Sequence, residues 1–501
     1  MNELVITDID SVNIKVSCER GIAKELSEFF TFEVPGHKYM PAYRNKIWDG
    51  QIKLYNLYSQ QIYKGLYDYV IKFAKDRSYT VVEPKRIKKS NIKKDYVRKY
   101  INDFLNPYAA GEKITAHDHQ VNAVEHAINN DRCLLLSPTG SGKSLIIYAL
   151  VRYYLDKLPK DKKILIIVPT TSLVQQMLSD FKEYSSHTSW KADDNCHCVF
   201  SGRDKISDKR IIISTWQSIY KMSKKYFDNF GACFGDECHL FKAKSLTSIM
   251  SKLTSCPFRI GTTGTLDGSV THKLVIEGLF GRINKVTSTK KLMDKDLLSK
   301  LTIDCLLLKY PEKTRSNVKR LKYPDEIDWL VINEKRNKFI VELTSRIKGN
   351  TLVLFQYVDK HGKELYKLME ESCKNRKVFF VHGRTDVEIR EDIRHITEKE
   401  DDAIIVASYG TFSTGISIRK LHNIIFASPS KSRIRVLQSI GRQLRKSKDK
   451  SMAKLYDIAD DLHWKSYKNH TLRHFEERIK IYESEQFDYK TIFINIDREA
   501  S

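Results

Sequence analysis

The stretch Ser137-Pro-Thr-Gly-Ser-Gly-Lys-Ser144 decides the fold of this chain. It lies between a short apolar run, Cys133–Leu136, and a helical apolar pattern that begins at Leu145. A strand, a glycine-bearing loop and a helix in this order can bind phosphate, because successive backbone N–H groups and the positive end of the helix dipole face the anion. The residues predicted to contact a nucleotide here are Pro138, Thr139, Gly140, Ser141, Gly142, Lys143 and Ser144.

Two side chains of this loop carry the expected chemistry. Lys143 can reach the outer phosphates of a nucleotide, and the Ser144 hydroxyl can bind Mg²⁺. The strict pattern has glycine where this chain has Ser137. An ordinary glycine and serine turn before a helix is the alternative interpretation, and the flanking strand and helix patterns disfavour it.

Working outward, three apolar runs after the loop end in polar residues. They end at Pro169-Thr170, at Thr215 and at Asp236-Glu237. Continuous apolar runs are typical of buried parallel strands, and the carboxyl ends of such strands form the ligand face of an open sheet. The alternation of strands and helices predicts a three-layer α/β domain over residues 115–285.

The acidic pair at the end of the third run suits a nucleotide site. One carboxylate can hold Mg²⁺ while its neighbour orients and deprotonates an attacking water. We assign Asp236 to the metal and Glu237 to the water. Gln120, at a helix start near the beginning of the domain, is a candidate to hydrogen-bond an adenine edge.

A second α/β pattern occupies residues 346–501 and contains no second phosphate loop. Its apolar runs begin at Thr351, Lys377, Ala403 and Asn423. Gln438, Arg442 and Arg445 are spaced by four and three residues, which places them on one face of a helix. An amide and two guanidinium groups on one face can grip a γ-phosphate and stabilise charge during phosphoryl transfer, although an exposed basic helix end has the same pattern.

The remaining segments are predicted from patterning and charge. Residues 1–84 alternate like a small α+β domain, residues 85–114 form a basic linker or helix, and residues 286–345 form a lysine-rich connection. Between residues 32 and 50, basic and aromatic side chains interleave, which suits nucleic acid, and Arg44 and Trp48 are candidate contacts. A hydrophobic core is the alternative use of these aromatic rings.

Composition narrows the partner. The 501 residues carry a formal net charge of +24, which indicates that the binding partner is a polyanion. Nucleic acid is favoured over an anionic membrane surface, because the sequence shows no amphipathic membrane anchor. The nine cysteines are an odd number and do not suggest a disulfide framework, which fits the reducing interior of a cell. The chain lacks a signal-like start and an apolar stretch of membrane-spanning length, so we expect no membrane association and a cytoplasmic protein, in the host cytoplasm if it is viral.

The motifs, taken in order, resemble those of superfamily-two helicases of the DExH type. The matching residues are Gln120, Ser137–Ser144, Pro169–Thr171, Ser214–Trp216, Asp236–His239, Thr263–Thr265, Ser413–Ile416 and Gln438–Arg445. This resemblance implies two tandem RecA-like domains that use ATP and Mg²⁺. It also implies that Lys143 and Ser144 bind the triphosphate and metal, that Arg442 and Arg445 are arginine fingers, and that Gly415 closes on the nucleotide.

The segment from Pro35 to Gly50 and the short N-terminal domain also resemble the UvsW-type recombination helicases of tailed phages. The resemblance implies a DNA-dependent ATPase that remodels branched DNA in recombination, repair and replication, including fork regression, Holliday junction migration and unwinding of D- or R-loops. Candidate backbone contacts are Pro169, Thr170, Thr215, Tyr409 and Thr414. We expect DNA as the partner, RNA–DNA hybrids and recombination or single-strand-binding proteins as further candidates, and a monomer.

Three other functions stay open at this point. An RNA helicase shares the same motifs. A passive nucleic-acid-binding protein with an inactive ATPase fold is disfavoured, because Lys143, Asp236, Glu237 and Gln438 are all present. A restriction motor fused to a nuclease is disfavoured because the terminal segments show no acidic nuclease cluster.

Overall fold

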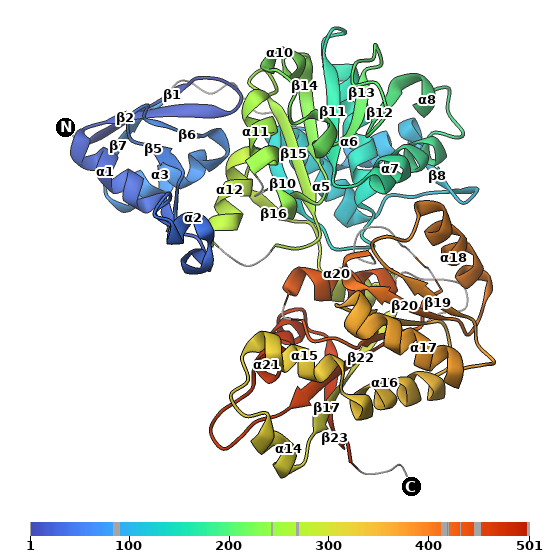
Figure 1. Cartoon of the computed structure of the whole chain (residues 1–501). Helices are drawn as coiled ribbons and strands as arrows, with labels where there is room; N and C mark the ends of the chain where they lie inside the picture. The colour runs from blue at the N-terminus through green and yellow to red at the C-terminus, as the bar shows by residue number, and fades with distance from the viewer. Residues whose placement is uncertain are drawn as a thin grey trace. The chain divides into compact units, whose positions relative to one another are not determined.

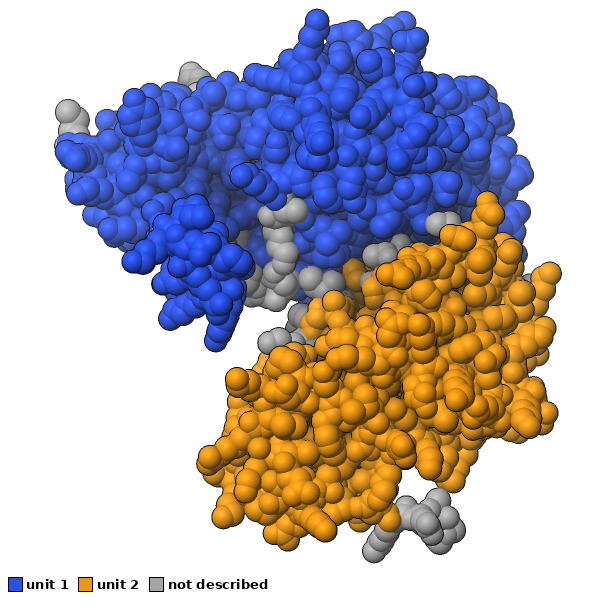
Figure 2. Space-filling model, viewed as in Figure 1, with its two compact units in different colours: residues 1–137, 141–287 blue, residues 138–140, 288–501 orange. Residues whose placement is uncertain are grey.

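The computed structural model describes residues 2–83, 91–241, 244–266, 270–411, 418, 420–430, 432–444 and 452–497 (Figure 1). At residues 270, 271, 387, 433, 434, 442 and 443 it describes the backbone without the side chain. The chain forms two compact units, which Figure 2 colours separately. The first contains residues 1–137 and 141–287, and the second contains residues 138–140 and 288–501.

The N-terminal part of the first unit is built on a five-stranded mixed sheet in the order β5-β6-β2-β1-β7. Its elements are β1 (Glu3–Asp8), β2 (Asn13–Cys18), α1 (Arg20–Phe29), β5 (Tyr55–Asn56), β6 (Gln61–Tyr63), η2 (Lys64–Leu66), α3 (Tyr67–Asp76) and β7 (Thr80–Val82). The two helices are amphipathic, and each buries one apolar face, which includes Leu26 on α1 and Phe73 on α3. A separate ribbon inserted in this part contains β3 (Thr31–Glu33), η1 (His37–Tyr39), α2 (Pro41–Arg44) and β4 (Gln51–Lys53).

A seven-stranded parallel sheet forms the rest of the first unit, in the order β12-β13-β11-β14-β15-β10-β16. The strands are β10 (Arg132–Leu136), β11 (Lys163–Val168), β12 (Cys196–Val199), β13 (Ile211–Thr215), β14 (Phe230–Gly235), β15 (Phe258–Thr263) and β16 (Ile283–Lys285). The main helices are α5 (Asp118–Asn130), α6 (Lys143–Lys157), α7 (Thr171–Tyr184), α11 (Lys244–Lys252) and α12 (Val270–Phe280). The central strands are buried on both faces, which is why they are continuous apolar runs in the sequence. The predicted α/β fold of this region is confirmed.

The described part of the predicted basic linker at 85–114 belongs to this first α/β domain. The described portion contains α4 (Lys94–Lys99), the π-helical turn η3 (Tyr100–Leu105), β8 (Tyr108–Ala109) and β9 (Glu112–Lys113). Val97, Ile101 and Leu105 are fully buried in the core that also contains α5 and α6. Residues 84–90, the most basic part of the prediction, lie outside the described residues.

The second unit repeats the architecture with a seven-stranded parallel sheet, β19-β20-β18-β21-β22-β17-β23. The strands are β17 (Lys300–Lys309), β18 (Thr351–Phe355), β19 (Val378–Val381), β20 (Ile404–Ser408), β21 (Asn423–Phe426), β22 (Met452–Asp461) and β23 (Asp488–Asn495). The helices are α13 (Thr289–Asp294), α14 (Glu312–Asn317), α15 (Tyr323–Val331), α16 (Glu334–Arg346), α17 (Lys363–Ser372), α18 (Val387–Lys399), α20 (Arg433–Gln443) and α21 (His470–Ser484). The chain therefore contains two tandem RecA-like α/β domains, and the predicted fold class is confirmed.

The segment 286–345 is not the connection that we predicted. It supplies β17, which pairs with β22 and β23 inside the second sheet, together with four helices. The polar Asp304 interrupts the apolar pattern of β17, yet it is buried and its carboxylate accepts from Lys454 at 2.8 Å. Within the described residues, no helix is both long and apolar enough to cross a bilayer.

Within the first unit, the N-terminal sheet and the larger parallel sheet share one hydrophobic core. The Tyr69 hydroxyl of α3 donates to the buried Glu277 carboxylate of α12 at 2.7 Å, and the other oxygen of Glu277 accepts from the Ile283 backbone at 2.9 Å. Arg132 at the start of β10 donates to the backbone carbonyl of Ser11 at 2.5 Å. These partly buried polar contacts help to fix the orientation of the N-terminal domain on the first α/β domain.

Candidate ATP site and nucleic-acid interface

The phosphate loop connects β10 to α6, as predicted from Ser137–Ser144. Gly142 has a φ of +80°, a left-handed conformation that favours glycine. A side-chain carbon there would lie 2.1 Å from the Gln120 amide nitrogen. The turn therefore favours glycine at 142, and a side chain there would also displace the Gln120 amide from the loop.

Gln120 and His119 at the start of α5 hold the loop from beneath. The Gln120 amide donates to the Ser141 carbonyl at 3.2 Å, and its oxygen accepts from the His117 backbone at 2.9 Å. The ring Nε2 of His119 donates to the same Ser141 carbonyl at 2.9 Å. The structure thereby gives Gln120 a loop-supporting role that the sequence did not indicate, and its contact with adenine stays a prediction.

The serine that replaces the first glycine of the pattern is part of the loop's hydrogen bonding. The Ser137 and Ser141 hydroxyl oxygens lie 2.6 Å apart, and both side chains are buried. Lys143 Nζ, on the first turn of α6, donates to the Ser137 carbonyl at 3.3 Å. The loop is therefore held closed by its own side chains, with Lys143 directed along it.

Asp236, which follows β14, is held in place from the neighbouring strand. Its Oδ1 accepts from the Thr262 hydroxyl at 2.7 Å and from the Glu237 backbone N–H at 2.9 Å. Burial and the adjacent Glu237 carboxylate raise the pKa of Asp236, whereas Lys143 and the Thr262 hydroxyl oppose that rise. Among the described residues nothing hydrogen-bonds Oδ2, so this oxygen suits a hard cation such as Mg²⁺.

Glu237 is held in a strained conformation at the same edge. Its φ of +51° is left-handed, which costs a side-chain-bearing residue about 1–2 kcal/mol and commonly marks an active site. Its carboxylate lies 3.3 Å from Nδ1 of His239. The Thr263 hydroxyl donates to the Thr265 carbonyl at 2.9 Å, so its oxygen accepts from His239 Nδ1 at 3.2 Å.

Strand β15 lies between β14 and β10 and links the two halves of the site. The Thr263 carbonyl accepts from the Ser137 backbone N–H at 2.9 Å, while Thr262 holds Asp236. The phosphate loop, the metal-binding candidate and the water-activating candidate are thus brought to one edge by two adjacent threonines. The sequence places Thr262 and Thr263 at the end of a strand, but it does not show that Thr262 holds Asp236.

Three predicted nucleic-acid contacts also meet at the carboxyl edge of this sheet. Pro169 and Thr170 follow β11, and Thr215 ends the adjacent parallel strand β13. Thr170 caps α7 by accepting from the Leu173 backbone at 3.3 Å, and Thr215 is 5% exposed. The structure brings these residues together, and their contact with a backbone phosphate stays a prediction.

The second unit contains the other predicted residues. Gln438 is half-buried on α20, and the backbone of Arg442 lies on the same helix. Thr414, Gly415 and Arg445 lie outside the described residues. The predicted roles of Gln438, Arg442 and Arg445 toward the nucleotide therefore stay predictions.

Tyr409 does not offer a free side chain to nucleic acid. It is 2% exposed, and its hydroxyl donates to the Ser428 carbonyl at 3.0 Å. The ring thus supports the loop that follows β21. Any contact with a DNA strand at this position requires the backbone rather than the ring.

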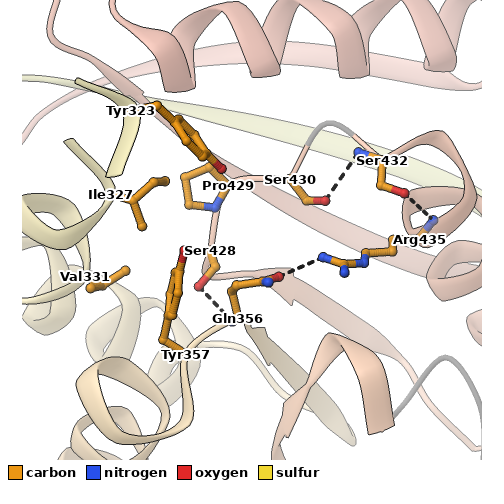
Figure 3. Close-up of a pocket in the computed structure, with 10 residues that line it drawn as sticks. All are labelled: Tyr323, Ile327, Val331, Gln356, Tyr357, Ser428, Pro429, Ser430, Ser432 and Arg435. Atoms are coloured by element: carbon orange, nitrogen blue, oxygen red, sulfur yellow. Dashed lines mark hydrogen bonds between the residues drawn. The ribbon is translucent and has the colours of Figure 1, made fainter. Parts of the chain in front are cut away.

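That loop borders a pocket that the sequence did not reveal (Figure 3). The pocket lies where β18 and β21, two adjacent parallel strands, end. In Figure 3, the rings of Tyr323 and Tyr357 border it near Ser428 and Pro429. Arg435 donates to the Gln356 side-chain oxygen at 2.8 Å on the same rim. Carboxyl ends of parallel strands are where open α/β sheets bind ligands, so these residues are additional candidates for contact with a nucleic-acid strand.

Arg44 and Trp48 lie in the ribbon of the N-terminal domain. The Trp48 indole donates to the Gln51 carbonyl at 2.8 Å and the ring is half-buried, so it anchors its own segment. Arg44 is exposed, with a long 3.4 Å hydrogen bond to the Lys38 carbonyl. Arg44 is therefore the more accessible of the two predicted contacts.

Three family profiles match successive parts of the chain. They are described as DNA helicase UvsW, N-terminal (residues 4–83), Type III restriction enzyme, res subunit (residues 113–268), and Helicase conserved C-terminal domain (residues 334–447). Together they follow the order in which the structure places the N-terminal domain and the two α/β sheets.

Individual relatives extend the match over the whole chain. The ATP-dependent DNA helicase uvsW of Enterobacteria phage T4 is 35% identical over 97% of this chain and 98% of its own length. The crystal structure of T4 UvsW superimposes with a TM-score of 0.52 and 32% identity, covering 99% of this chain and 100% of that one. A fragment of a putative HsdR subunit of a type I restriction enzyme from Vibrio vulnificus, at 17% identity and a TM-score of 0.57, covers 81% of this chain and 72% of its own, and shows the shared fold.

These matches cover the N-terminal domain and every motif in its observed order. The structure adds a phosphate loop and an acidic pair that β15 brings to one edge of the sheet. The chain is accordingly a nucleic-acid-dependent ATPase that uses ATP and binds DNA. It belongs to the UvsW family of ATP-dependent DNA helicases.

Proposed function

We propose that this helicase remodels branched DNA by regressing forks, migrating Holliday junctions and unwinding D- or R-loops during recombination, repair and replication restart. The observation that carries the proposal is the N-terminal domain, which shares its core with the first α/β domain and is fixed by the Tyr69–Glu277 hydrogen bond. A DNA-facing element that is rigidly attached to the ATPase domain moves with it during each ATP cycle. Such an element can act on the arms of a junction while the motor moves along one of them.

Within the ATP site, Ser144 and Asp236 would hold Mg²⁺, which supplies charge neutralisation at the phosphates when it is bound. The chain's own groups perform the remaining tasks. Lys143 and the loop N–H groups bind the outer phosphates, and Glu237 orients and accepts a proton from water. Thr262 fixes the Asp236 carboxylate, and the left-handed backbone at Glu237 sets the position of the neighbouring carboxylate.

The basic surface supports binding to the DNA backbone rather than sequence reading. A net charge of +24 predicts that affinity falls with added salt, because each neutralised phosphate releases counterions. Phosphate contacts position a strand and carry no base information, so we expect structure-dependent rather than sequence-dependent binding. Affinity that stays constant between low and moderate ionic strength would contradict this expectation.

The deciding experiment compares three substrates of matched length: a synthetic fork, a four-way junction and an RNA–DNA hybrid loop. We expect ATP-driven remodelling of all three by the wild type and none by Glu237→Gln, which retains the fold and the phosphate loop. Activity on the RNA–DNA hybrid loop with none on the fork or the four-way junction would instead indicate an RNA helicase. Equal remodelling by Glu237→Gln would indicate passive binding without a motor.

A further inference from the structure

The ribbon β3–β4 of the N-terminal domain ends in a compact insertion, residues 34–50, that we call the tip lobe. In Figure 1 its helix α2 stands out from the five-stranded sheet. The ribbon pairs Thr31 with Lys53 and Glu33 with Gln51, so the lobe is carried on two hydrogen-bonded strands rather than on a loose loop. At its base, Phe32 and Ile52 pack against the core of the unit.

The tip lobe has its own small internal support. The His37 side chain is 8% exposed, its Nδ1 donates to the Val34 carbonyl at 2.9 Å, and its ring packs edge-on against Tyr43. Gly50 adopts a left-handed φ of +80°, and a side-chain carbon there would lie 2.5 Å from the His37 ring. The lobe is therefore a built structure with a defined outer surface.

That outer surface exposes large apolar side chains. Tyr39 is 78% exposed, Ile47 is 79% exposed and Met40 is 39% exposed. Nothing in the folding of the lobe requires these side chains to be apolar, since its interior is formed by His37, Tyr43 and Trp48. Several exposed apolar side chains on so small a lobe indicate an interaction site.

The same surface is basic. Lys38, Arg44 and Lys46 are exposed, and none of them forms an ion pair with a residue that the structure describes. Asp49, the acidic residue of the lobe, is already paired with Lys53 at 2.8 Å. Cations that have no ion pair among the described residues, on the same lobe as exposed apolar side chains, match a ligand with both phosphates and apolar faces, which is DNA with unstacked bases.

From these contacts we infer that the tip lobe is a strand-parting wedge. Lys38, Arg44 and Lys46 bind the phosphates that flank a branch point, and Tyr39 and Ile47 stack against or insert beside the bases that open there. This inference rests on the proposed function, because a wedge acts only in an enzyme that separates or exchanges strands. It reassigns the earlier predicted contact at Trp48, whose ring anchors the lobe, to the exposed neighbours Tyr39 and Ile47.

The test uses the full chain with the double substitution Tyr39→Ala/Ile47→Ala. Because both side chains are exposed, the fold is expected to be retained, and circular dichroism and the melting temperature check this. The matched control is Tyr58→Ala, which removes a 99% exposed ring from the turn between β5 and β6, a turn with no charged residue at 57–60. Remodelling of a fork is measured together with ATP hydrolysis, so that the number of base pairs opened per ATP can be compared.

We expect the double variant to open about tenfold fewer base pairs per ATP, since removing one aromatic stacking contact weakens base binding by about 5- to 150-fold. Tyr58→Ala should match the wild type. A second readout needs no ATP: the fluorescence of 2-aminopurine placed at the branch point should rise when the wild type binds and stay low with the double variant.

Three results would overturn the wedge. One is an unchanged yield per ATP together with an unchanged 2-aminopurine signal, and another is an equal defect in Tyr58→Ala. The third is loss of self-association by sedimentation in the double variant without any change at the branch point, which would make the lobe a protein contact. If the wild type remodels no substrate, the proposed function fails, and the 2-aminopurine signal still decides separately whether the lobe unstacks bases.

Discussion

The two units contain the same seven-stranded parallel architecture but use acidic side chains in opposite ways. In the first, Asp236 and Glu237 lie past the end of β14, where Thr262, a lysine and backbone groups surround them. In the second, Asp457 and Asp460 lie inside β22, and each forms an ion pair with a buried arginine.

The contacts of the second unit are structural. Asp457 accepts from Arg478 of α21 at 2.8 Å, and Asp460 accepts from Arg336 of α16 at 2.9 Å. The four side chains are at most 1% exposed. A carboxylate neutralised in this way ties a helix to the sheet and is not available to a metal or a water. The comparison shows that position along the strand, and not the presence of an acid, separates the carboxylates that we propose for catalysis from the structural ones.

The largest expected effect is on hydrolysis in the first unit. Glu237→Gln should reduce the turnover of ATP by about 10²–10⁴, because general-base assistance is lost while the side-chain volume is kept. Binding of a fluorescent ATP analogue should be retained, and the melting temperature should change little. If the variant hydrolyses ATP within a few-fold of the wild-type rate, Glu237 is not the general base.

The matching substitution in the second unit should act on stability. Asp457→Asn leaves Arg478 buried without its counter-charge, and breaking a buried ion pair costs about 3–5 kcal/mol. Chemical denaturation followed by far-UV circular dichroism should show an early transition for the second unit. Asp236→Asn is the control, and we expect it to abolish hydrolysis without that early transition.

Thr262→Val sharpens the comparison by changing only how Asp236 is held. Loss of the 2.7 Å hydrogen bond to a carboxylate should lower ATP turnover about tenfold and raise the Mg²⁺ concentration needed for half-maximal rate. Thr262→Ser keeps the hydroxyl and should restore both values. A Mg²⁺ dependence that is identical in all three proteins would show that Thr262 is merely part of the packing.

The smallest expected effect comes from restoring the missing glycine of the phosphate loop. Ser137→Gly removes the 2.6 Å contact with Ser141 and should destabilise the first unit by about 1 kcal/mol, with ATP turnover changed only a few-fold. Ser141→Ala removes the same contact from the other side. The double variant should therefore be no less stable than the worse single variant, and simple additivity of the two effects would contradict the contact.

The sequence predicted the parts of the site that are contiguous. The phosphate loop, the acidic pair and the three strand ends at Pro169, Thr215 and Asp236 were recognisable because local residue patterns specify a strand followed by a turn. The prediction that residues 286–345 only connect the two domains was wrong, because β17 of this segment pairs with β22 and β23, which lie near the end of the chain, and no local pattern shows that pairing. Side-chain exposure was equally hidden: Trp48 and Tyr409 are committed to internal contacts, whereas Tyr39 and Ile47 are exposed.

By itself, then, the sequence determined the class of fold, the phosphate loop and the acidic pair, since each depends on residues that are neighbours in the chain. Only the tertiary structure decided that Thr262 holds Asp236, that Gln120 supports the loop at Ser141, and that the N-terminal domain is fixed to the first α/β domain. These contacts join residues separated by between 21 and 208 positions. Their partners are set by how strands and helices pack, and no local pattern records that packing.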